Sequence, residues 1–288
     1  MAAKRLVYLM SLRNAAADQA GQWVTCRGER CYMKSPLEYL VGQLERTALG
    51  RYYTLAGVIY DDVPGYARDM EKVGGYGFAP GEGEHWICPP DLQVQGRALR
   101  DLMENLPSSY RALPAADTAG RAAGKAEFER RLEARLLALQ ADLVVVDGLI
   151  LILDALVRPG AVFHNRVFNI HPGVTRADSP YERRGATATL DALYGARGQK
   201  VLNWQTMESR PVTPLYRTGA SFHVVDGGID SGPVEGMDYD AVTQLLTEEG
   251  LLDPEDYGVS VAATFGYRSR EIDPKPRKPL DELVVWAK

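Results

Sequence analysis

Apolar runs of strand length alternate along this sequence with stretches whose apolar residues recur at helical spacing. Near-continuous Val, Ile and Leu runs bounded by turn residues are typical of strands buried on both faces. We expect strands within residues 5–12, 52–61, 142–153, 161–172 and 219–234, and helices over 35–49 and 124–141. Ser35 as N-cap and Glu38 three residues later mark the start of the first helix. The alternation predicts an α/β fold, a Rossmann-like, mostly parallel sheet with helices on both faces.

Two stretches depart from this pattern. Residues 62–125 begin with a segment rich in Gly and Pro and have little periodicity before the helix, so we expect an insertion of loops and helix over the sheet. Residues 240–288 carry prolines and mixed charge, which predicts a C-terminal extension along the surface. Neither stretch has the features of an independent domain, so we expect one catalytic domain over residues 1–288.

Composition narrows the class of protein. The chain has 288 residues, with 33 basic against 38 acidic side chains and a formal net charge of −5, which argues against a nucleic-acid partner. No apolar run approaches the roughly 20 residues of a membrane span, and the run before Arg13 is too short for a signal peptide. An odd number of cysteines, three, favours a reducing compartment. We therefore expect a cytoplasmic protein, monomeric or weakly oligomeric, that acts on a small molecule.

Candidate chemistry begins where one apolar run ends. Asn169 and His171 are two residues apart, so in a strand their side chains share a face, and Pro172-Gly173 then ends the strand. In parallel sheets, ligands bind beyond the carboxyl ends of the strands. A later Gly-rich loop contains Asp226 and Asp230.

These residue types match the needs of acyl transfer. An Asn amide can donate a hydrogen bond to a developing oxyanion, and an imidazole can do the same or relay a proton. A nearby carboxylate can hold the imidazole charged or pass protons through water. No Ser or Cys nucleophile is required if the attacking group is an amine of the substrate.

The motifs NIHPG (169–173), RRGA (183–186) and GASFHVVDGGIDSGPV (219–234) together resemble the formyltetrahydrofolate-dependent formyltransferases. The resemblance implies that Asn169, His171 and Asp230 are catalytic, that 10-formyltetrahydrofolate is the cosubstrate, and that no metal is needed. It also implies that VVVDGLILILDALV (144–157) cradles the pterin ring, opposite the later loop. The cofactor-binding residues implied are Gly148, Leu149, Leu151, Ile152, Leu153, Val225, Asp226 and Gly227.

The acceptor side departs from the best-known members of the family. After the first strand the chain reads MSLRNAAADQ, which lacks the glycines of a phosphate-binding loop but offers Arg13 and Asn14. Arg can grip a carboxylate in bidentate fashion, so we expect Arg13, Asn14 and Ile150 to contact a carboxylate-bearing amino-acid substrate. KRLVYLMSLRNAAADQAGQWV (4–24) and RCYMKSPLEYLV (30–41), together with the long insertion, are similar to the branch of the family that formylates N5-hydroxyornithine during synthesis of the hydroxamate siderophore pyoverdine.

Other functions remain open at this point. A sugar amine or another small amine could be the acceptor, or water could replace it, which would make the chain a formyltetrahydrofolate hydrolase. A non-catalytic folate-binding protein is a further alternative. A nicotinamide-dependent enzyme is disfavoured because G-x-G-x-x-G does not follow the first strand.

Several other polar residues receive structural interpretations. Asp226 is expected to shape its turn, and His164 and His223 to be structural, His223 in support of the site or in the core. Arg183 and Arg184 could bind the glutamate tail of the folate or the carboxylate of the substrate, or they could form a solvated pair in a loop. Residues Cys26, Cys31, His85 and Cys88 could hold zinc, but their pairs are far apart in sequence, so we expect free thiols.

Overall fold

The computed structural model describes residues 2–26, 28–74, 86–149, 151–173, 175, 184–215 and 220–234. Its helices are α1 (Leu12–Ala17), α2 (Pro36–Arg46), α3 (Leu49–Tyr52), α4 (Ala67–Val73), α5 (Thr118–Ala138) and α6 (Ala188–Ala196), with single turns η1 (Leu99–Leu102), η2 (Ser109–Ala112) and η3 (Gly185–Thr187). Its strands are β1 (Lys4–Met10), β2 (Trp23–Cys26), β3 (Glu29–Tyr32), β4 (Tyr53–Tyr60), β5 (Gln93–Val94), β6 (Arg97–Ala98), β7 (Met103–Asn105), β8 (Leu143–Asp147), β9 (Val167–His171), β10 (Gln199–Asn203), β11 (Glu208–Pro211) and β12 (Ser221–Val224). The predictions for His85, Ile150, Arg183 and 240–288 lie outside the described residues.

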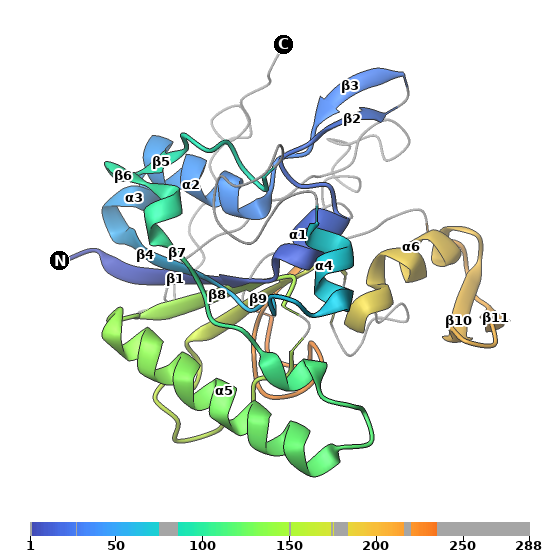
Figure 1. Ribbon diagram of the computed structural model, residues 1–288. Helices are drawn as coiled ribbons and strands as arrows, with labels where there is room; N and C mark the ends of the chain where they lie inside the picture. The colour runs from blue at the N-terminus through green and yellow to red at the C-terminus, as the bar shows by residue number, and fades with distance from the viewer. Residues whose placement is uncertain are drawn as a thin grey trace, which may run out of the picture.

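A six-stranded sheet in the order β12-β9-β8-β1-β4-β7 forms the centre of the molecule (Figure 1). Only β12 runs antiparallel to its neighbour, and every other pair in this sheet is parallel. The mostly parallel α/β sheet predicted from the sequence is therefore confirmed. The carboxyl ends of β1, β4, β8 and β9 meet at one edge.

Helices cover both faces of this sheet, as Figure 1 shows. On one face, Leu37, Val41 and Leu44 of α2 pack in a first core that also includes Tyr8 and Val145. On the other face, a second core contains Phe128, Leu132 and Leu136 of α5 together with Val144, Val146 and Val167 of the sheet. α2 begins as predicted, because Ser35 Oγ accepts a hydrogen bond from the Glu38 N–H at 3.1 Å. Burial of these apolar faces fixes where the strand ends lie.

The strand expected over 142–153 is shorter than predicted. β8 ends at Asp147, and Gly148 follows with φ of 59°, a left-handed conformation that favours glycine. The amide of Asn14 donates a hydrogen bond to the Gly148 carbonyl, which holds the turn against the end of β1. The remaining apolar residues therefore form an irregular segment beyond the sheet edge.

The prediction that 62–125 is wholly an insertion over the sheet is wrong in one respect. Within it, β7 pairs in parallel with β4 and forms the outer strand of the main sheet. The last turns of the segment belong to α5, which starts at Thr118 because the Asp117 carboxylate accepts the Gly120 N–H at 2.8 Å. Three residues of strand were too short a signal to detect by periodicity.

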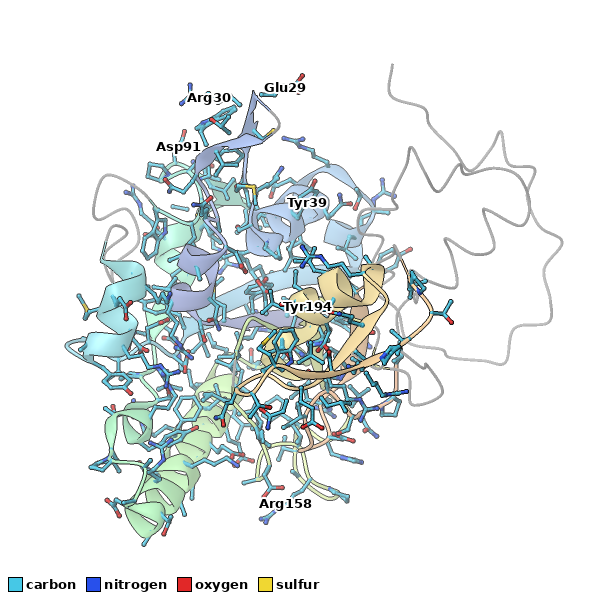
Figure 2. The ribbon with its side chains drawn as sticks, turned by 90° about the vertical axis from the view of Figure 1, so that its right-hand side faces the viewer. Glu29, Arg30, Tyr39, Asp91, Arg158 and Tyr194 are labelled. Atoms are coloured by element: carbon cyan, nitrogen blue, oxygen red, sulfur yellow. The ribbon has the colours of Figure 1, made fainter. Side chains whose placement is uncertain are left out.

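Among the described residues, three hairpins pair outside the central sheet: β2–β3, β5–β6 and β10–β11 (Figure 1). Glu29 and Arg30 lie at the projecting end of the first (Figure 2). The Arg30 guanidinium lies 5.2 Å from the ring centre of Trp23, which is 59% exposed. Among the described helices, none combines the length and apolar character needed to cross a bilayer.

Candidate active site

The candidate site lies at the carboxyl ends of β8 and β9. Asn169 and His171 are on β9, on the same face as Val167 of the second core. β12 runs alongside, so that His223 is the cross-strand partner of Asn169 and Ser221 that of His171. Ser221 Oγ donates to the Gly173 carbonyl at 2.8 Å, which secures the turn immediately after His171.

Asp230 reaches the pair from the loop after β12. Its Oδ1 accepts a hydrogen bond from Asn169 Nδ2 at 3.1 Å, and its Oδ2 lies 3.3 Å from His171 Nδ1. The Gly185 N–H donates to the same Oδ2 at 2.8 Å. The structure thus brings together the three residues that the sequence placed in a catalytic group.

His223 is a fourth member of this group. Its Nδ1 lies 2.9 Å from the Val224 carbonyl, so in the neutral ring Nδ1 carries the hydrogen and Nε2 is an acceptor. Nε2 lies 3.2 Å from Asn169 Nδ2 and 3.3 Å from Asp230 Oδ1. The sequence left open whether His223 supports the site or belongs to the core. Only the β9–β12 register places its ring beside Asn169.

The carboxyl of Asp230 is tuned by opposing effects. Burial raises its pKa, but the His223 imidazole, the Gly185 N–H and the charge of His171 outweigh burial and hold the pKa below its usual range. Asp230 is therefore a carboxylate at neutral pH. Its φ of 47° is left-handed, a conformation that Asp tolerates better than most residues.

Asp226 has a different environment. Its Oδ1 accepts hydrogen bonds from Ser231 Oγ at 2.6 Å and from the Gly228 N–H at 3.1 Å. Both contacts are within its own loop, which supports the turn-shaping role expected from the sequence.

The two segments predicted to bind the folate lie against each other. Gly227 packs so closely that a Cβ there would be 3.4 Å from Asp154 Oδ1 and 3.7 Å from the Leu153 carbonyl. Leu153 is buried, and Leu149, Leu151 and Val225 pack at the edge of the second core. Ile152 and Ile229 are 45% and 57% exposed, so apolar side chains are available to a flat, partly apolar ligand at these segments. Backbone groups and apolar surface of this kind fit a pterin.

Of the residues predicted to contact the acceptor, Asn14 lies at the edge of the candidate site and Arg13 is buried among carboxylates. Asn14 lies at the Gly148 turn, as described above. Arg13 is buried, and its Nη1 lies 2.8 Å from Asp61 Oδ1 and 3.2 Å from Asp62 Oδ1. Because its charge is already neutralised by buried carboxylates, the geometry favours a structural role for Arg13 over a grip on the substrate.

Arg184 also has a partner in the protein. Its Nη2 donates to the Thr175 carbonyl at 2.9 Å, which connects the two sides of the segment between β9 and α6. This contact favours a structural contribution over the solvated pair that the sequence left open.

The zinc alternative gains no support from the described residues. Within them, no three His, Cys, Asp or Glu side chains are grouped so as to hold a metal ion. Cys88 is buried, and burial together with the Glu38 charge raises the pKa of its thiol to about 12. A thiol of this kind is neither a ready metal ligand nor a nucleophile.

Comparison with known proteins supplies an independent test of this interpretation. No family model matches the chain. PvdF of pyoverdin biosynthesis, a structurally unique N10-formyltetrahydrofolate-dependent formyltransferase, is 60% identical, with a TM-score of 0.74 over 79% of this chain and 84% of that one. Glycinamide ribonucleotide transformylase 1 from Symbiobacterium toebii aligns at 19% identity, with a TM-score of 0.38 over 88% of this chain and 85% of that one, too low to bear on function.

A different similarity is confined to a short stretch. A protein named as an NAD(P)H nitroreductase from Haemophilus influenzae is 64% identical over 60 residues, which are 21% of this chain. The chain spans 27% to 38% of the length of the curated relatives it matches. A match over so small a part of both chains does not support nitroreductase chemistry in this protein.

The sheet and the Asn–His–Asp group at its carboxyl edge define an α/β enzyme of the formyltransferase fold. With 60% identity over most of both chains, this chain belongs to the N10-formyltetrahydrofolate-dependent formyltransferases. Its cosubstrate is accordingly 10-formyltetrahydrofolate.

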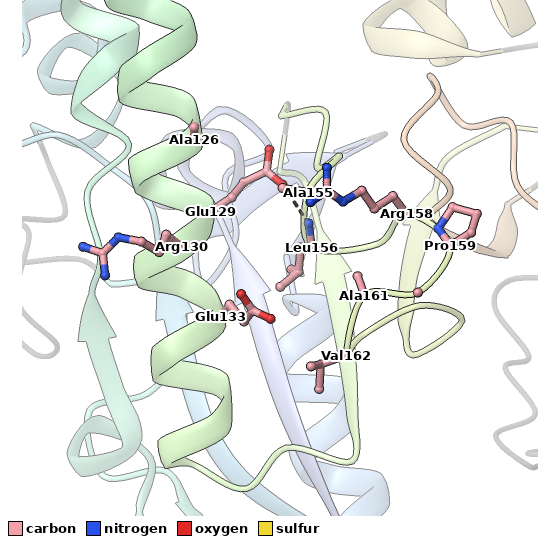
Figure 3. A pocket seen from close by; sticks show the side chains of 11 residues that line it. Ala126, Glu129, Arg130, Glu133, Ala155, Leu156, Arg158, Pro159, Ala161 and Val162 are labelled. Carbon is pink, nitrogen blue, oxygen red and sulfur yellow. Dashed lines mark hydrogen bonds between the residues drawn. The ribbon is translucent and has the colours of Figure 1, made fainter.

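A buried glutamate supports the segment predicted to hold the folate. Glu129 of α5 is 3% exposed, and its Oε2 accepts the N–H groups of Asp154 at 2.9 Å and Leu156 at 3.0 Å. Lys125 Nζ lies 3.4 Å from the other carboxylate oxygen. Figure 3 shows Glu129 extending from the helix toward this segment. The same side chain lines a hollow of about 430 Å³. Sequence reasoning missed Glu129 because nothing in a helix pattern shows which loop it meets.

Replacing Glu129 by Ala is expected to raise the KM for 10-formyltetrahydrofolate about tenfold with a smaller change in kcat, because two N–H groups lose a charged acceptor. Glu129→Gln, which keeps an acceptor oxygen, is expected to restore most of the affinity. Glu133→Gln, on the same helix and lining the same hollow, serves as the control. Steady-state kinetics with varied folate measures this. An unchanged KM in the Ala variant, with lowered stability alone, would contradict it.

Proposed function

We propose that this enzyme transfers the formyl group of 10-formyltetrahydrofolate to the side-chain hydroxylamine of N5-hydroxyornithine. The product is N5-formyl-N5-hydroxyornithine, a hydroxamate for siderophore assembly of the pyoverdine type. The observation that carries this proposal is the Asn169–His171–Asp230 group at the carboxyl edge of the sheet, in a chain that is 60% identical to a formyltransferase of pyoverdin biosynthesis.

The chemistry of the acceptor is consistent with the reaction. A plain alkylamine has a pKa near that of Lys, about 10.4, and is almost entirely protonated at pH 7. A hydroxylamine is much less basic, so its nitrogen is available as a neutral nucleophile without a strong general base. The site accordingly needs donors for an oxyanion and a route for one proton.

The reaction proceeds through a tetrahedral intermediate. The hydroxylamine nitrogen attacks the formyl carbon, and the carbonyl electron pair moves to oxygen as the new C–N bond forms. Asn169 and His171 donate hydrogen bonds to that oxygen, an effect worth on the order of 3 kcal/mol per donor in other enzymes. Collapse restores the carbonyl and breaks the bond to N10, which takes up the proton lost by the hydroxylamine.

Asp230 and His223 prepare the donors for this step. The Asn169 amide nitrogen lies within hydrogen-bond distance of both Asp230 and His223, so its two hydrogens are engaged while the His223 ring is neutral. When the contact with His223 Nε2 opens, one Asn169 hydrogen becomes available to the oxyanion while the other stays on Asp230. Asp230 also holds His171 oriented and, through water, carries the proton toward N10.

Release of tetrahydrofolate, followed by absorbance, tests the proposal directly. The assay uses N5-hydroxyornithine, ornithine, a sugar amine and no acceptor, each with the wild type and with His171→Ala. We expect turnover with the hydroxylamine only, and its loss in the variant. Turnover without an acceptor would make the protein a hydrolase, and turnover with the sugar amine alone would replace the proposed substrate. Folate binding without any turnover would favour the non-catalytic alternative.

A further inference from the structure

Asp147 is a partly buried acid beside the candidate site to which the reaction gives no role. It is the last residue of β8 and is in register with Met10 of β1 and Ile170 of β9. Ile170 lies between Asn169 and His171, and adjacent strands are about 4.8 Å apart. The backbone of Asp147 is therefore one strand spacing from that of the catalytic pair, at the edge where the strands end.

The Asp147 side chain lies on the sheet face opposite to that of Asn169 and His171. The alternation along β8 places Val144 and Val146 in the second core, on the face of Asn169 and His171, and Val145 and Asp147 on the face of Tyr8. Tyr8 is fully buried, and its hydroxyl donates to Asp147 Oδ2 at 2.7 Å. The predicted folate segment packs on the second core. Asp147 therefore lies on the sheet face opposite the one on which the predicted folate segment packs.

The charge of Asp147 has no counterpart within the described part of the chain. No Lys, Arg or His there forms an ion pair with it, and the nearby Asp18 has the same sign. Burial raises the pKa of Asp147 to about 6, with a further increase from Asp18, although the Tyr8 hydroxyl opposes them. A carboxylate held in this way is stabilised by any cation that a ligand brings.

We propose that Asp147 binds the ammonium group of an amino-acid acceptor and selects for it. The assignment rests on the proposed function and adds the residue that recognises the acceptor. The α-nitrogen and the side-chain nitrogen of an ornithine derivative are joined by a flexible aliphatic chain, so one acceptor can extend from the end of β8 to the end of the neighbouring β9. The ammonium can therefore lie at Asp147 while the hydroxylamine lies at Asn169 and His171. The carboxylate-gripping role expected of Arg13 is replaced by recognition of the ammonium group on the same α-carbon.

The test compares Asp147→Asn with the wild type on two acceptors. One is N5-hydroxyornithine, and the other is 5-(hydroxyamino)pentanoate, which has the same hydroxylamine but no α-amino group. The variant is expected to raise the KM for N5-hydroxyornithine at least tenfold, to leave the KM for 10-formyltetrahydrofolate within twofold, and to leave the KM for the truncated acceptor unchanged. Asp142→Asn, at an exposed acid beside the opposite end of β8, is the control and is expected to change none of these values.

The pH dependence supplies a second readout. As the pH falls through about 6, Asp147 becomes protonated in the free enzyme, so the ratio of variant to wild-type KM is expected to fall toward one by pH 5. The groups that face Asp147 are Tyr8, which stays protonated because burial raises its pKa well above the usual value, and Asp18. The titration of the substrate itself cancels in the ratio.

The possible outcomes separate this assignment from the proposed function. Because an uncharged amide can still accept the Tyr8 hydrogen bond, Asp147→Asn is expected to fold with a midpoint of thermal unfolding at pH 7 no lower than that of the wild type. Equal KM values for N5-hydroxyornithine in both proteins, or an equal rise for both acceptors, would overturn the role of Asp147 alone. No wild-type turnover of N5-hydroxyornithine would overturn the proposed function and this assignment with it.

Discussion

Replacing Asp230 by Asn is expected to lower kcat about 1,000-fold while the protein still folds and binds 10-formyltetrahydrofolate. The carboxylate accepts hydrogen bonds from Asn169 and from the Gly185 N–H, and lies 3.3 Å from ring nitrogens of both His171 and His223. An amide has one acceptor oxygen in place of two and no charge to stabilise a protonated imidazole. The measurement is the rate of tetrahydrofolate release with saturating N5-hydroxyornithine.

The choice of Asn separates chemistry from backbone strain. Asp230 has φ of 47°, and Asn is among the few residues that adopt this left-handed conformation readily. Asp226→Asn is the matched control, since Asp226 is on the same loop but bonds only within it. A kcat for Asp230→Asn within tenfold of the wild type would show that the carboxylate is not part of the catalytic group.

The same variant has a defined effect on the pH dependence of stability. The folded-state pKa of Asp230 is lowered, so its ionised form contributes stability above the unfolded pKa of about 3.9, and this is lost as the pH falls through the folded value. We therefore expect the difference in thermal midpoint between wild type and Asp230→Asn to narrow below pH 4. Thermal unfolding at stepwise pH measures this.

Replacing Arg13 by Met is expected to destabilise the fold by about 3–5 kcal/mol, because it leaves buried carboxylates without their cation. Asp61, Asp62 and Asp69 are all fully buried, and Arg13 lies within 3.7 Å of each. Arg111 lies 3.5 Å from Asp61 Oδ2 and also pairs with Asp69, but it cannot replace the hydrogen bonds that Arg13 makes. Urea-induced unfolding of wild type and variant gives the free-energy difference.

This variant also decides between the two roles considered for Arg13. If Arg13 gripped the acceptor carboxylate, the Met variant would raise the KM for the acceptor and leave the unfolding midpoint unchanged. The geometry instead predicts a lower unfolding midpoint as the main effect, with a smaller change in the KM for the acceptor. Arg130→Met is the control, because Arg130 pairs with Glu127 on the exposed surface of α5 and its loss is expected to leave the midpoint where it was.

Local sequence was sufficient to predict most of the sheet and the positions of the candidate catalytic residues along the chain. Asn169 and His171 share a face because side chains in a strand alternate with a period of two, which depends on spacing alone. The start of α2 at Ser35 likewise depends on neighbours within one turn. Asp230 could be matched by its motif, although its contacts with the pair cross 59 and 61 residues of chain, and only the structure could show them.

Tertiary structure decided what depends on pairing between distant segments. Arg13 pairs with residues 48 and 49 positions later in the chain. The sequence suggested that its charge was available to a substrate, but in the structure these carboxylates neutralise it. His223 entered the site through the β9–β12 register, and β7 joined the sheet although its three residues carry no periodic signal. Asp147 acquired its hydrogen bond to Tyr8 only because β1 and β8 lie side by side. Strand register and burial are determined by the packing of the whole sheet, and neither is encoded in the spacing of neighbouring residues.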